Sequence, residues 1–331
     1  MNEAAESVLS VHDLAVSYRR GGRALAVVNG VSFDVRPGEI FGLVGESGSG
    51  KSTVIRSLIQ LLPANATIDG GEVTFAGRSL LPLAERDMQK VRGRDIGMVF
   101  QDPLNSLNPV MTVGEQIGET LKTSDGARRS RREQILAAMR LVHLPDPGRL
   151  YSAYPHELSG GLRQRVAIAI ALVESPKLLL ADEPTTALDV TIQDQILKLL
   201  IELSGRLGMS VILVTHDLGV VAQTCQRVAV LYAGRIVESG PVERIFARPA
   251  HPYTAGLLQS IPRGSASEGR LRGIGGTPPS LDNIPTGCPF HPRCAFAIAA
   301  CSGDRPPLVA HEASHLTACL RHGELAGLTH G

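Results

Sequence analysis

One eight-residue stretch constrains the fold of this chain more than any other: Gly45-Glu-Ser-Gly-Ser-Gly-Lys-Ser52. The mainly apolar residues 39–44 before it predict a short buried strand, and residues 53–62 after it have helical periodicity. This order of strand, G-x-x-x-x-G-K-S and helix is typical of a phosphate-binding loop. The glycines let backbone N–H groups point inward, and the helix N-terminus favours an anion. We therefore expect the chain to bind a nucleoside triphosphate rather than to carry a flexible Gly/Ser linker here.

The same stretch, with the residue after it, supplies the side chains expected at the nucleotide. The Lys51 ammonium can contact the outer phosphates, and the Ser52 hydroxyl can bind Mg²⁺. The predicted nucleotide-binding residues here are Gly45, Ser47, Gly48, Ser49, Gly50, Lys51, Ser52 and Thr53.

The bulk properties narrow the class of protein. With 331 residues, the chain can form one large domain and a smaller one, and its net charge of +1 favours neither nucleic acid nor an acidic substrate. The longest apolar run, residues 166–173, is too short to span a bilayer. The acidic N-terminus lacks the apolar core of a signal peptide, so we expect a cytoplasmic protein.

The rest of the chain has the pattern of an α/β protein. Residues 8–18 and 24–35 alternate as antiparallel strands do, whereas residues from 111 to about 155 have only helical patterns. Further on, apolar strands alternate with a long helix at 191–207, which predicts a parallel sheet with its site at the carboxyl ends of the strands. These later strands are expected at 177–181, 209–215 and 227–232.

Polar residues end several of the predicted strands. Asp182 is suited to hold Mg²⁺, and Glu183 beside it could polarise a water molecule that attacks the γ-phosphate. Gln101 could reach the Mg²⁺ or that water, and His216 could contact the γ-phosphate. Taken singly, each pattern also fits an ordinary polar residue at a strand end. Together they predict one catalytic edge of the sheet.

A second anion site is predicted at Leu158-Ser-Gly-Gly-Leu162, which opens a long helix. One domain does not need two phosphate sites for one nucleotide, unless the second site serves the nucleotide of a partner. This arrangement predicts a head-to-tail dimer with ATP between the subunits.

As a set, these motifs resemble the ATP-binding subunit of an ABC transporter over about residues 8–262. The family's motifs occur in its order. They are the phosphate loop, the glutamine loop (Gln101), the signature loop (Ser159, Gly160, Gly161, Leu162), the Asp182-Glu183 pair, the D-loop (Ala187-Leu-Asp189) and the switch His216. One departure is Leu162, where the commonest signature has Gln, so a side-chain polar contact is in doubt there.

The resemblance implies a fold, an activity and an adenine contact. The fold is an α/β P-loop NTPase (ABC ATPase) with a RecA-like core, an antiparallel β subdomain, a helical subdomain and a Cys-rich C-terminal extension. The expected domains are an ATPase domain over 1–240, with its helical subdomain at about 111–175, and an extension over 241–331. The activity is hydrolysis of ATP with Mg²⁺, and Tyr18 would stack on the adenine, although it also fits an ordinary strand aromatic.

Further motifs are similar to the oligopeptide/dipeptide importer branch of this family. They are the loop of residues 101–109, His251-Pro-Tyr-Thr254 and Pro285-Thr-Gly-Cys-Pro-Phe-His-Pro-Arg-Cys294. The resemblance implies a second ATPase subunit, more in keeping with a heterodimer, together with two transmembrane permease subunits and an external solute-binding protein. It implies a peripheral location on the cytoplasmic face of the membrane and no nucleic acid partner. Residues 102–109 would receive the permease.

Several alternatives to peptide import stay open from the sequence. The solute could be nickel, glutathione or another small molecule, since partners choose it. A non-transport ABC ATPase usually has two ATPase halves or a long coiled-coil insertion, and this chain has neither. A subunit that binds ATP but hydrolyses it poorly is the third alternative, against which the full set of site residues argues.

Four of the five cysteines lie in the last 44 residues, at Cys288, Cys294, Cys301 and Cys319. Disulfides are disfavoured in the cytoplasm, and no close C-x₂₋₄-C pair suggests zinc, although His311 and His315 have zinc-like spacing. Four thiolates without close pairs suit an iron–sulfur cluster, and the family resemblance points to [4Fe–4S]. We predict that cluster, with zinc or unoccupied thiols as the alternatives.

Overall fold

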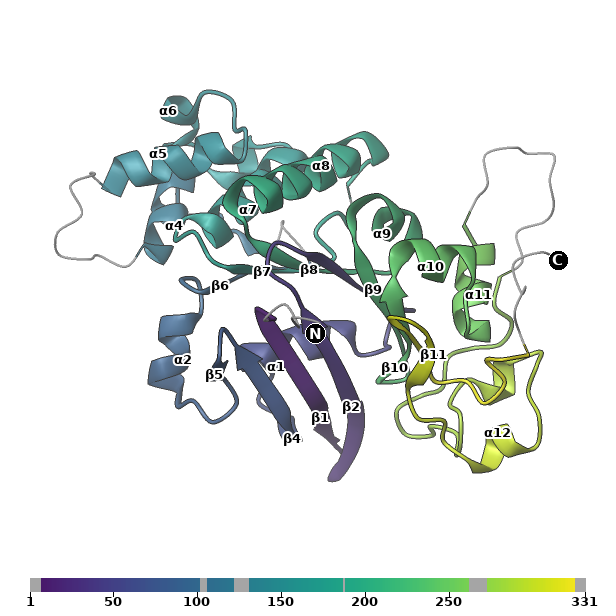
Figure 1. Cartoon of the computed structure of the whole chain (residues 1–331). Coiled ribbons are helices and arrows are strands. Elements are labelled where there is room, and N and C mark those ends of the chain that lie inside the picture. The colour runs from purple at the N-terminus through teal and green to yellow at the C-terminus, as the bar shows by residue number, and fades with distance from the viewer. Residues whose placement is uncertain (1–6, 102–105, 122–130, 187, 262–272, 325–331) are drawn as a thin grey trace, which may run out of the picture. The chain divides into compact units, whose positions relative to one another are not determined.

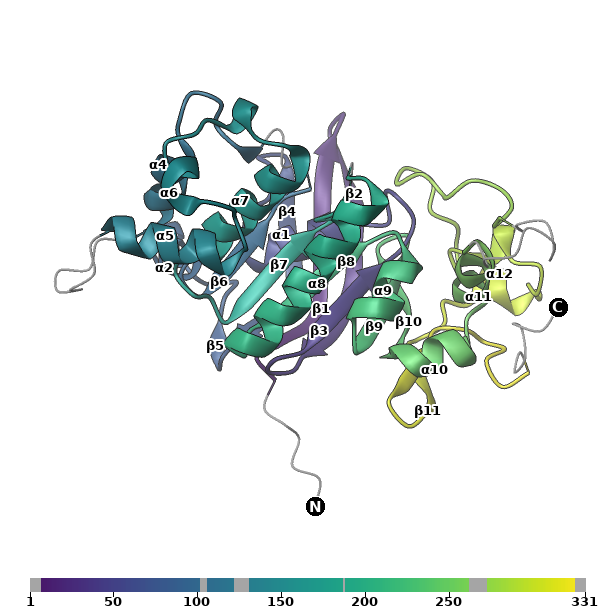
Figure 2. The same ribbon diagram turned by 90° about the horizontal axis from the view of Figure 1, so that it is seen from above.

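A computed structural model describes residues 7–101, 106–121, 131–186, 188–261 and 273–324. The chain divides into two compact units, each of which is built from separated segments. The first unit comprises residues 1–8, 35–40 and 82–214, and the second comprises 9–34, 41–81 and 215–331. Figures 1 and 2 locate the elements of each unit from two sides.

An antiparallel sheet forms the N-terminal part of the second unit (Figure 1). Its strand order is β2-β1-β4-β5, and β1 pairs with β4 from Leu9↔Phe75 to Tyr18↔Ala66. The strands are β1 (Leu9–Arg20), β2 (Arg23–Val35), β4 (Ala66–Phe75) and β5 (Arg78–Ser79). The alternation at residues 8–18 and 24–35 thus predicted two real strands, because one face of each is buried.

The second unit also contains part of a larger sheet, to which the chain after residue 232 adds strands. β3 (Ile40–Val44) pairs in parallel with β9 (Arg227–Tyr232), and β3 is buried throughout. Antiparallel pairs then follow in the order β9, β10, β12, β11. These added strands are β10 (Arg235–Pro241), β11 (Val309–Glu312) and β12 (His315–Thr317). The sequence patterns did not predict them; β10 and β12, which pair with each other, are far apart in the chain.

Short helices accompany these strands. The phosphate loop leads into α1 (Lys51–Leu58), which begins two residues before the predicted helix and ends four residues before its predicted end. The other helical segments of the second unit are α9 (Leu218–Thr224), α10 (Val242–Ala247), α11 (Pro252–Gln259), the 3₁₀ turn His291–Arg293 and α12 (Ala300–Gly303).

The first unit contains three parallel strands in the order β6-β7-β8. They are β6 (Ile96–Val99), β7 (Leu178–Asp182) and β8 (Ser210–Thr215), of which β7 and β8 are buried at every residue. Such unbroken burial explains why both strands are continuous apolar runs in the sequence. The long helix α8 (Val190–Leu207) crosses one face of β7 and β8 in both views (Figures 1 and 2).

Helices make up the remainder of the first unit. Within residues 111–155, the described part of the chain forms helices and turns without a strand, as its patterns predict. The helices of the unit besides α8 are α2 (Glu85–Val91), α4 (Val113–Thr120), α5 (Arg131–Leu141), α6 (Pro147–Leu150), the 3₁₀ turn Pro155–Glu157 and α7 (Gly160–Leu172). A capping box of Thr112 and Glu115 starts α4, which satisfies N–H groups at its first turn. Among the described helices, we find none that is both long and apolar enough to cross a membrane.

Candidate nucleotide-binding site

The phosphate loop of the second unit is folded around its own lysine. The Lys51 Nζ donates to the carbonyl oxygens of Gly45 at 2.8 Å and Glu46 at 3.0 Å, and the Lys51 residue is only 5 % exposed. Gly50 is the N-cap of α1 and supplies no side-chain cap, and the positive end of the helix dipole lies at this residue. The loop thereby gathers an ammonium group and a helix N-terminus at one place.

Two glycines are required by the backbone of this loop. Gly45 has φ 156° and Gly50 has φ 103°, conformations that residues with a Cβ rarely adopt. A Cβ on Gly45 would come within 2.8 Å of Ser49 Oγ, and one on Gly50 within 2.9 Å of the Val27 carbonyl oxygen. The loop can therefore keep this tight turn only with glycine at both positions.

The donors of the loop suit an anionic ligand. Ser49 Oγ is buried and has no hydrogen-bond partner among the described residues, although a buried hydroxyl normally has one. Ser47 and Gly48 are exposed at the outer side of the loop. A triphosphate would supply an acceptor oxygen for Ser49, so the residues present fit the phosphates of ATP.

Tyr18 and Thr53 meet within this unit. The Tyr18 hydroxyl lies 3.1 Å from Thr53 Oγ1, which joins β1 to the first turn of α1. Tyr18 is half-buried, and Ser52, also half-buried, follows the lysine in α1. The second unit therefore connects the predicted adenine contact directly to a predicted phosphate-binding residue. His216, in the same unit, is exposed just after β8.

In the first unit, the end of β7 carries the predicted catalytic carboxylates. Asp182 is fully buried at the last position of the strand, and Glu183 follows with a positive φ of 47°. The Glu183 N–H donates to the Val214 carbonyl oxygen at 3.0 Å, which holds this residue next to β8. A left-handed backbone at a residue with a Cβ costs about 1–3 kcal/mol and is typical of functional sites.

The Glu183 carboxylate is held by two side chains of the same unit. Its Oε2 accepts from Gln101 Nε2 at 3.1 Å and from Thr186 Oγ1 at 2.9 Å. The structure thus brings together Gln101 and Glu183, which are 82 residues apart in the sequence. Sequence reasoning missed Thr186, and its only signal was its position three residues after Glu183 in the same turn.

The signature loop begins a helix with an exposed N-terminus. Ser159 is the N-cap of α7 and accepts from the Leu162 N–H at 3.4 Å; Ser159 and Gly160 are exposed, whereas Gly161 is buried against Ile192. Two polar or small residues therefore face solvent at a helix N-terminus, where an anion is favoured.

The other predicted motifs of the first unit are described only in part. Asp189 of the D-loop is exposed and caps α8, because its Oδ1 accepts from the Ile192 N–H at 2.9 Å. Ala187 of the same loop lies outside the described residues. So do residues 102–105 of the loop predicted to receive the permease.

The four C-terminal cysteines do come together, but not as a metal site. They are free thiols, all half-buried, and all four line a cavity of about 20 Å³, which is room for about one water molecule. Burial raises the pKa of the Cys288 and Cys294 thiols, and that of Cys319 to about 11, which disfavours the thiolates that a metal would need. Within the described ranges, no group of three or more His, Cys, Asp or Glu side chains could hold a metal ion. The prediction of a [4Fe–4S] cluster at Cys288, Cys294, Cys301 and Cys319 is therefore wrong.

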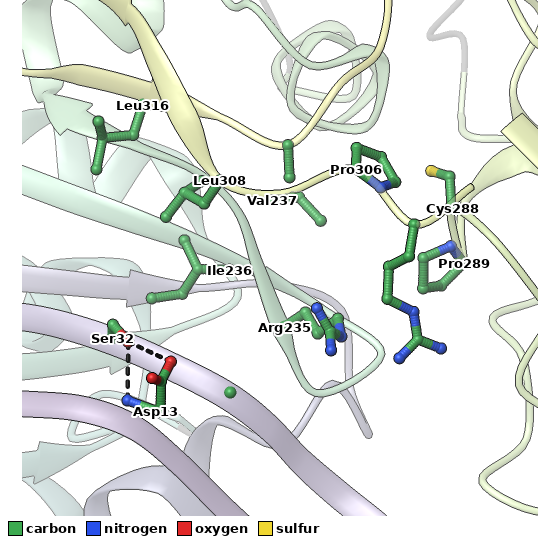
Figure 3. A pocket seen from close by; sticks show the side chains of 13 residues that line it. Asp13, Ser32, Arg235, Ile236, Val237, Cys288, Pro289, Pro306, Leu308 and Leu316 are labelled. Carbon is green, nitrogen blue, oxygen red and sulfur yellow. Dashed lines mark hydrogen bonds between the residues drawn. The ribbon is translucent and has the colours of Figure 1, made fainter. Parts of the chain in front are cut away.

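A larger cavity borders the same segment (Figure 3). It has a volume of about 480 Å³, and its walls include Asp13, Ser32, Arg235 and Cys288. Ser32 Oγ accepts from the Asp13 N–H at 2.9 Å and donates to its carboxylate at 3.3 Å. None of the described residues that line this cavity belongs to the phosphate loop, so Cys288 borders a space separate from the nucleotide site.

Two further residues contact the phosphate loop from the C-terminal segment (residues 241–331), and sequence reasoning missed both. Arg293 pairs with the carboxylate of Glu46, and the Tyr253 hydroxyl accepts from the Glu46 N–H. They are 247 and 207 residues away from Glu46 in the chain, and their sequence surroundings carry no signal for such a contact.

Comparisons with known proteins agree with this geometry. Residues 28–186 match the ABC transporter family, and residues 237–301 match the family of the oligopeptide/dipeptide transporter C-terminal region. A probable peptide ABC transporter ATP-binding protein of Sinorhizobium fredii is 50% identical over 330 residues, which are 99% of this chain and 98% of that protein. The dipeptide transport ATP-binding protein DppD of Bacillus subtilis is 48% identical over 95% of this chain and 94% of its own length.

Solved structures give the same result. The dimeric post-hydrolysis ATP-binding cassette MJ0796, bound to ADP and Pi, is 29% identical and superposes with a TM-score of 0.62. It covers 71% of this chain and 98% of its own length. With its phosphate loop, its Asp182-Glu183 strand end and its signature helix, the chain belongs to the ATP-hydrolysing ATP-binding proteins of ABC transporters, in the oligopeptide/dipeptide branch.

Proposed function

We propose that this chain is the subunit that couples ATP hydrolysis to the import of peptides through an ABC transporter. The observation that carries the proposal is the folded phosphate loop, in which the Lys51 ammonium is held by the Gly45 and Glu46 carbonyl oxygens at the start of α1. Relatives of nearly the same length whose names specify peptide or dipeptide transport support the choice of solute.

In this proposal, the phosphate loop and Tyr18 hold the nucleotide. The loop N–H groups and Lys51 bind the phosphates, and Tyr18 stacks on the adenine while its hydroxyl stays near Thr53. Ser52, Gln101 and Asp182 bind Mg²⁺, which neutralises charge on the phosphates when it is bound. The buried Ser49 hydroxyl, which has no partner among the described residues, supports phosphate binding by the loop, because a phosphate oxygen would accept its hydrogen.

Glu183 would act as the general base. Its carboxylate is oriented by the Gln101 amide and the Thr186 hydroxyl, so one oxygen is fixed and the residue does not rotate freely. His216 would contact the γ-phosphate, and Asp189 would begin α8 at the interface with the partner.

The exposed signature helix supports a dimer in which each chain completes the site of the other. Ser159, Gly160 and Gly161 would then bind the nucleotide of the partner, because nothing in the described part of the first unit covers Ser159 or Gly160. We propose a second ATPase subunit, two permease subunits and an external binding protein as partners, on the cytoplasmic face of the membrane.

Reconstitution tests the proposal. The chain is co-purified with its permease and placed in vesicles, and ATPase activity is measured with the binding protein and a mixture of dipeptides and oligopeptides. We expect peptides to stimulate ATPase activity, and labelled peptide to accumulate on the side of the vesicle membrane that carries the ATPase subunit. Stimulation by Ni²⁺ or glutathione, with no response to peptides, would refute peptide import while leaving the ATPase assignment intact.

A further inference from the structure

The second residue of the phosphate loop, Glu46, is held from three directions within the second unit. Its N–H donates to the Tyr253 hydroxyl at 2.9 Å. Its carbonyl oxygen accepts from Lys51 Nζ at 3.0 Å and from the Ser49 N–H at 3.2 Å. The residue that supports the phosphate-binding lysine is therefore bonded, through its own N–H, to helix α11.

The Glu46 carboxylate is paired with an arginine of the C-terminal segment. Arg293 Nη1 lies 2.7 Å from Glu46 Oε2, and Nη2 lies 3.0 Å from Oε1, which is a bidentate pair. The Arg293 side chain is 5% exposed and that of Glu46 is 25% exposed, so water screens the pair weakly.

Arg293 is itself fixed by its surroundings. Its Nε donates to the Gly275 carbonyl oxygen at 2.9 Å, and Nη1 also donates to the Tyr232 hydroxyl at 3.3 Å. The guanidinium carbon lies 5.8 Å from the ring centres of both Tyr232 and Phe290. Hydrogen bonds with Glu46 raise the pKa of Arg293 above its ordinary value, so it stays charged.

This arrangement solves an electrostatic problem. A carboxylate within a loop that binds a triphosphate repels its ligand, and the repulsion is strong where solvent screening is poor. A bidentate guanidinium neutralises that charge and also holds the Glu46 side chain in one orientation. Loss of the guanidinium would leave the carboxylate uncompensated beside the phosphates.

We propose that Arg293 and Tyr253 are positioning residues of the phosphate loop, through which the C-terminal segment controls affinity for the nucleoside triphosphate. Arg293 neutralises and orients the Glu46 side chain, and Tyr253 fixes the Glu46 backbone that supports Lys51. This inference rests on the proposed role of the loop in binding ATP. It assigns to the C-terminal segment a part in nucleotide binding.

The first test measures binding of the non-hydrolysable ATP analogue AMP-PNP to the purified full-length chain by calorimetry. Arg293→Gln should weaken the affinity by about tenfold, as expected for loss of a charge-assisted pair. The exposed Arg305→Gln is the matched control in the same segment and should bind like the unmodified chain.

Removal of the second partner separates neutralisation from simple structural support. Adding Glu46→Gln to Arg293→Gln should restore the affinity to within about threefold of the unmodified chain, because no carboxylate remains to repel the phosphates. Glu46→Gln alone should bind at least as tightly as the unmodified chain. If the double variant binds as weakly as Arg293→Gln or more weakly, the proposal is wrong.

Two further variants keep the test decisive if Arg293→Gln fails to fold. Arg293→Lys keeps the charge but not the bidentate geometry and should weaken binding by about threefold. Tyr253→Phe removes the acceptor of the Glu46 N–H and should have an effect of similar size. Unchanged affinity in both would overturn the inference. Absence of AMP-PNP binding to the unmodified chain would instead refute the proposed nucleotide site.

Discussion

The phosphate loop and the cysteine-containing C-terminal segment acquire their shapes in different ways. The loop of residues 45–52 is closed by bonds among near neighbours, such as Lys51 to Gly45 and Ser49 to Glu46. The C-terminal segment is instead fixed by distant partners: Arg293 reaches Glu46, and His315 Nε2 lies 2.7 Å from the buried Glu238 carboxylate.

This difference decides what residue spacing can mean in each region. In the loop, the spacing of residues in the sequence determines the backbone geometry directly, because the glycines, the lysine and the first turn of the helix lie within a few residues of one another. In the C-terminal segment, the spacing of the cysteines in the sequence does not determine the volume of the cavity between them. That cavity has a volume of about 20 Å³. The predictions below test the two halves of this comparison.

The largest effect is expected at the end of β7. Glu183→Gln keeps the size of the side chain and an acceptor for Thr186, but it removes the base, so turnover of ATP should fall by about 10³-fold with binding retained. Phosphate release and AMP-PNP binding are measured on the same preparation. Near-normal hydrolysis of ATP would show that Glu183 is not the general base. The position of a carboxylate at the end of β7 would then not identify the catalytic residue.

A smaller effect is expected in the loop itself. Lys51→Ala removes the ammonium that the loop is folded around, and AMP-PNP affinity should fall by about 100-fold. Cys301→Ser, in the cysteine-containing segment, is the contrasting variant and should change the affinity by less than about twofold. Equal losses in both variants would mean that the cysteines belong to the nucleotide site after all.

The elements that the sequence predicts are those with local signals, whereas contacts between distant parts of the chain were missed. The run at 227–232 coincides with β9, and the predicted phosphate loop has the expected strand and helix around it. The pairing of β10 with β12 and the Arg293–Glu46 pair could not be predicted, because each depends on partners that only the folded chain brings close.

The cysteine prediction failed for a related reason. The family resemblance and the absence of tight pairs suggested a cluster, but neither contains information about burial or cavity volume. By contrast, Gln101 and Glu183 were expected at one edge from their strand ends, and their 3.1 Å contact confirms that proximity. Parallel strands impose this edge by topology, whatever the distance in sequence.

Thiol reactivity tests the second half of the comparison. Burial raises the pKa of Cys319 to about 11 from an unfolded value of 9.0, so the reactive thiolate is scarce near pH 8. After allowance for the greater nucleophilicity of a less acidic thiol, iodoacetamide should modify Cys319 about tenfold more slowly in the native chain than in urea. Peptide mass mapping gives both rates. Equal rates would mean that the segment is not folded onto its partners in solution.

The last prediction concerns His251, whose N–H donates to the Glu238 carboxylate of β10. His251 is 1% exposed, its Nδ1 accepts from the Tyr253 N–H at 3.1 Å, and burial lowers its pKa from 6.5 to about 3. The folded chain therefore keeps this imidazole neutral while the unfolded chain takes up a proton below pH 6.5. Its contribution to the free energy of unfolding is present above pH 6.5 and is lost as the pH falls, by up to about 1.4 kcal/mol per pH unit.

Urea titrations between pH 7 and pH 4.5 measure this slope. His251→Asn keeps a side-chain acceptor for the Tyr253 N–H but cannot take up the proton, so its free energy of unfolding should fall less steeply with acid. His12→Asn, at an exposed histidine of β1, should keep the slope of the unmodified chain. If all three chains lose stability at the same rate, His251 is not buried as a neutral group, and the long-range contacts that fix the C-terminal segment are weaker than its geometry implies.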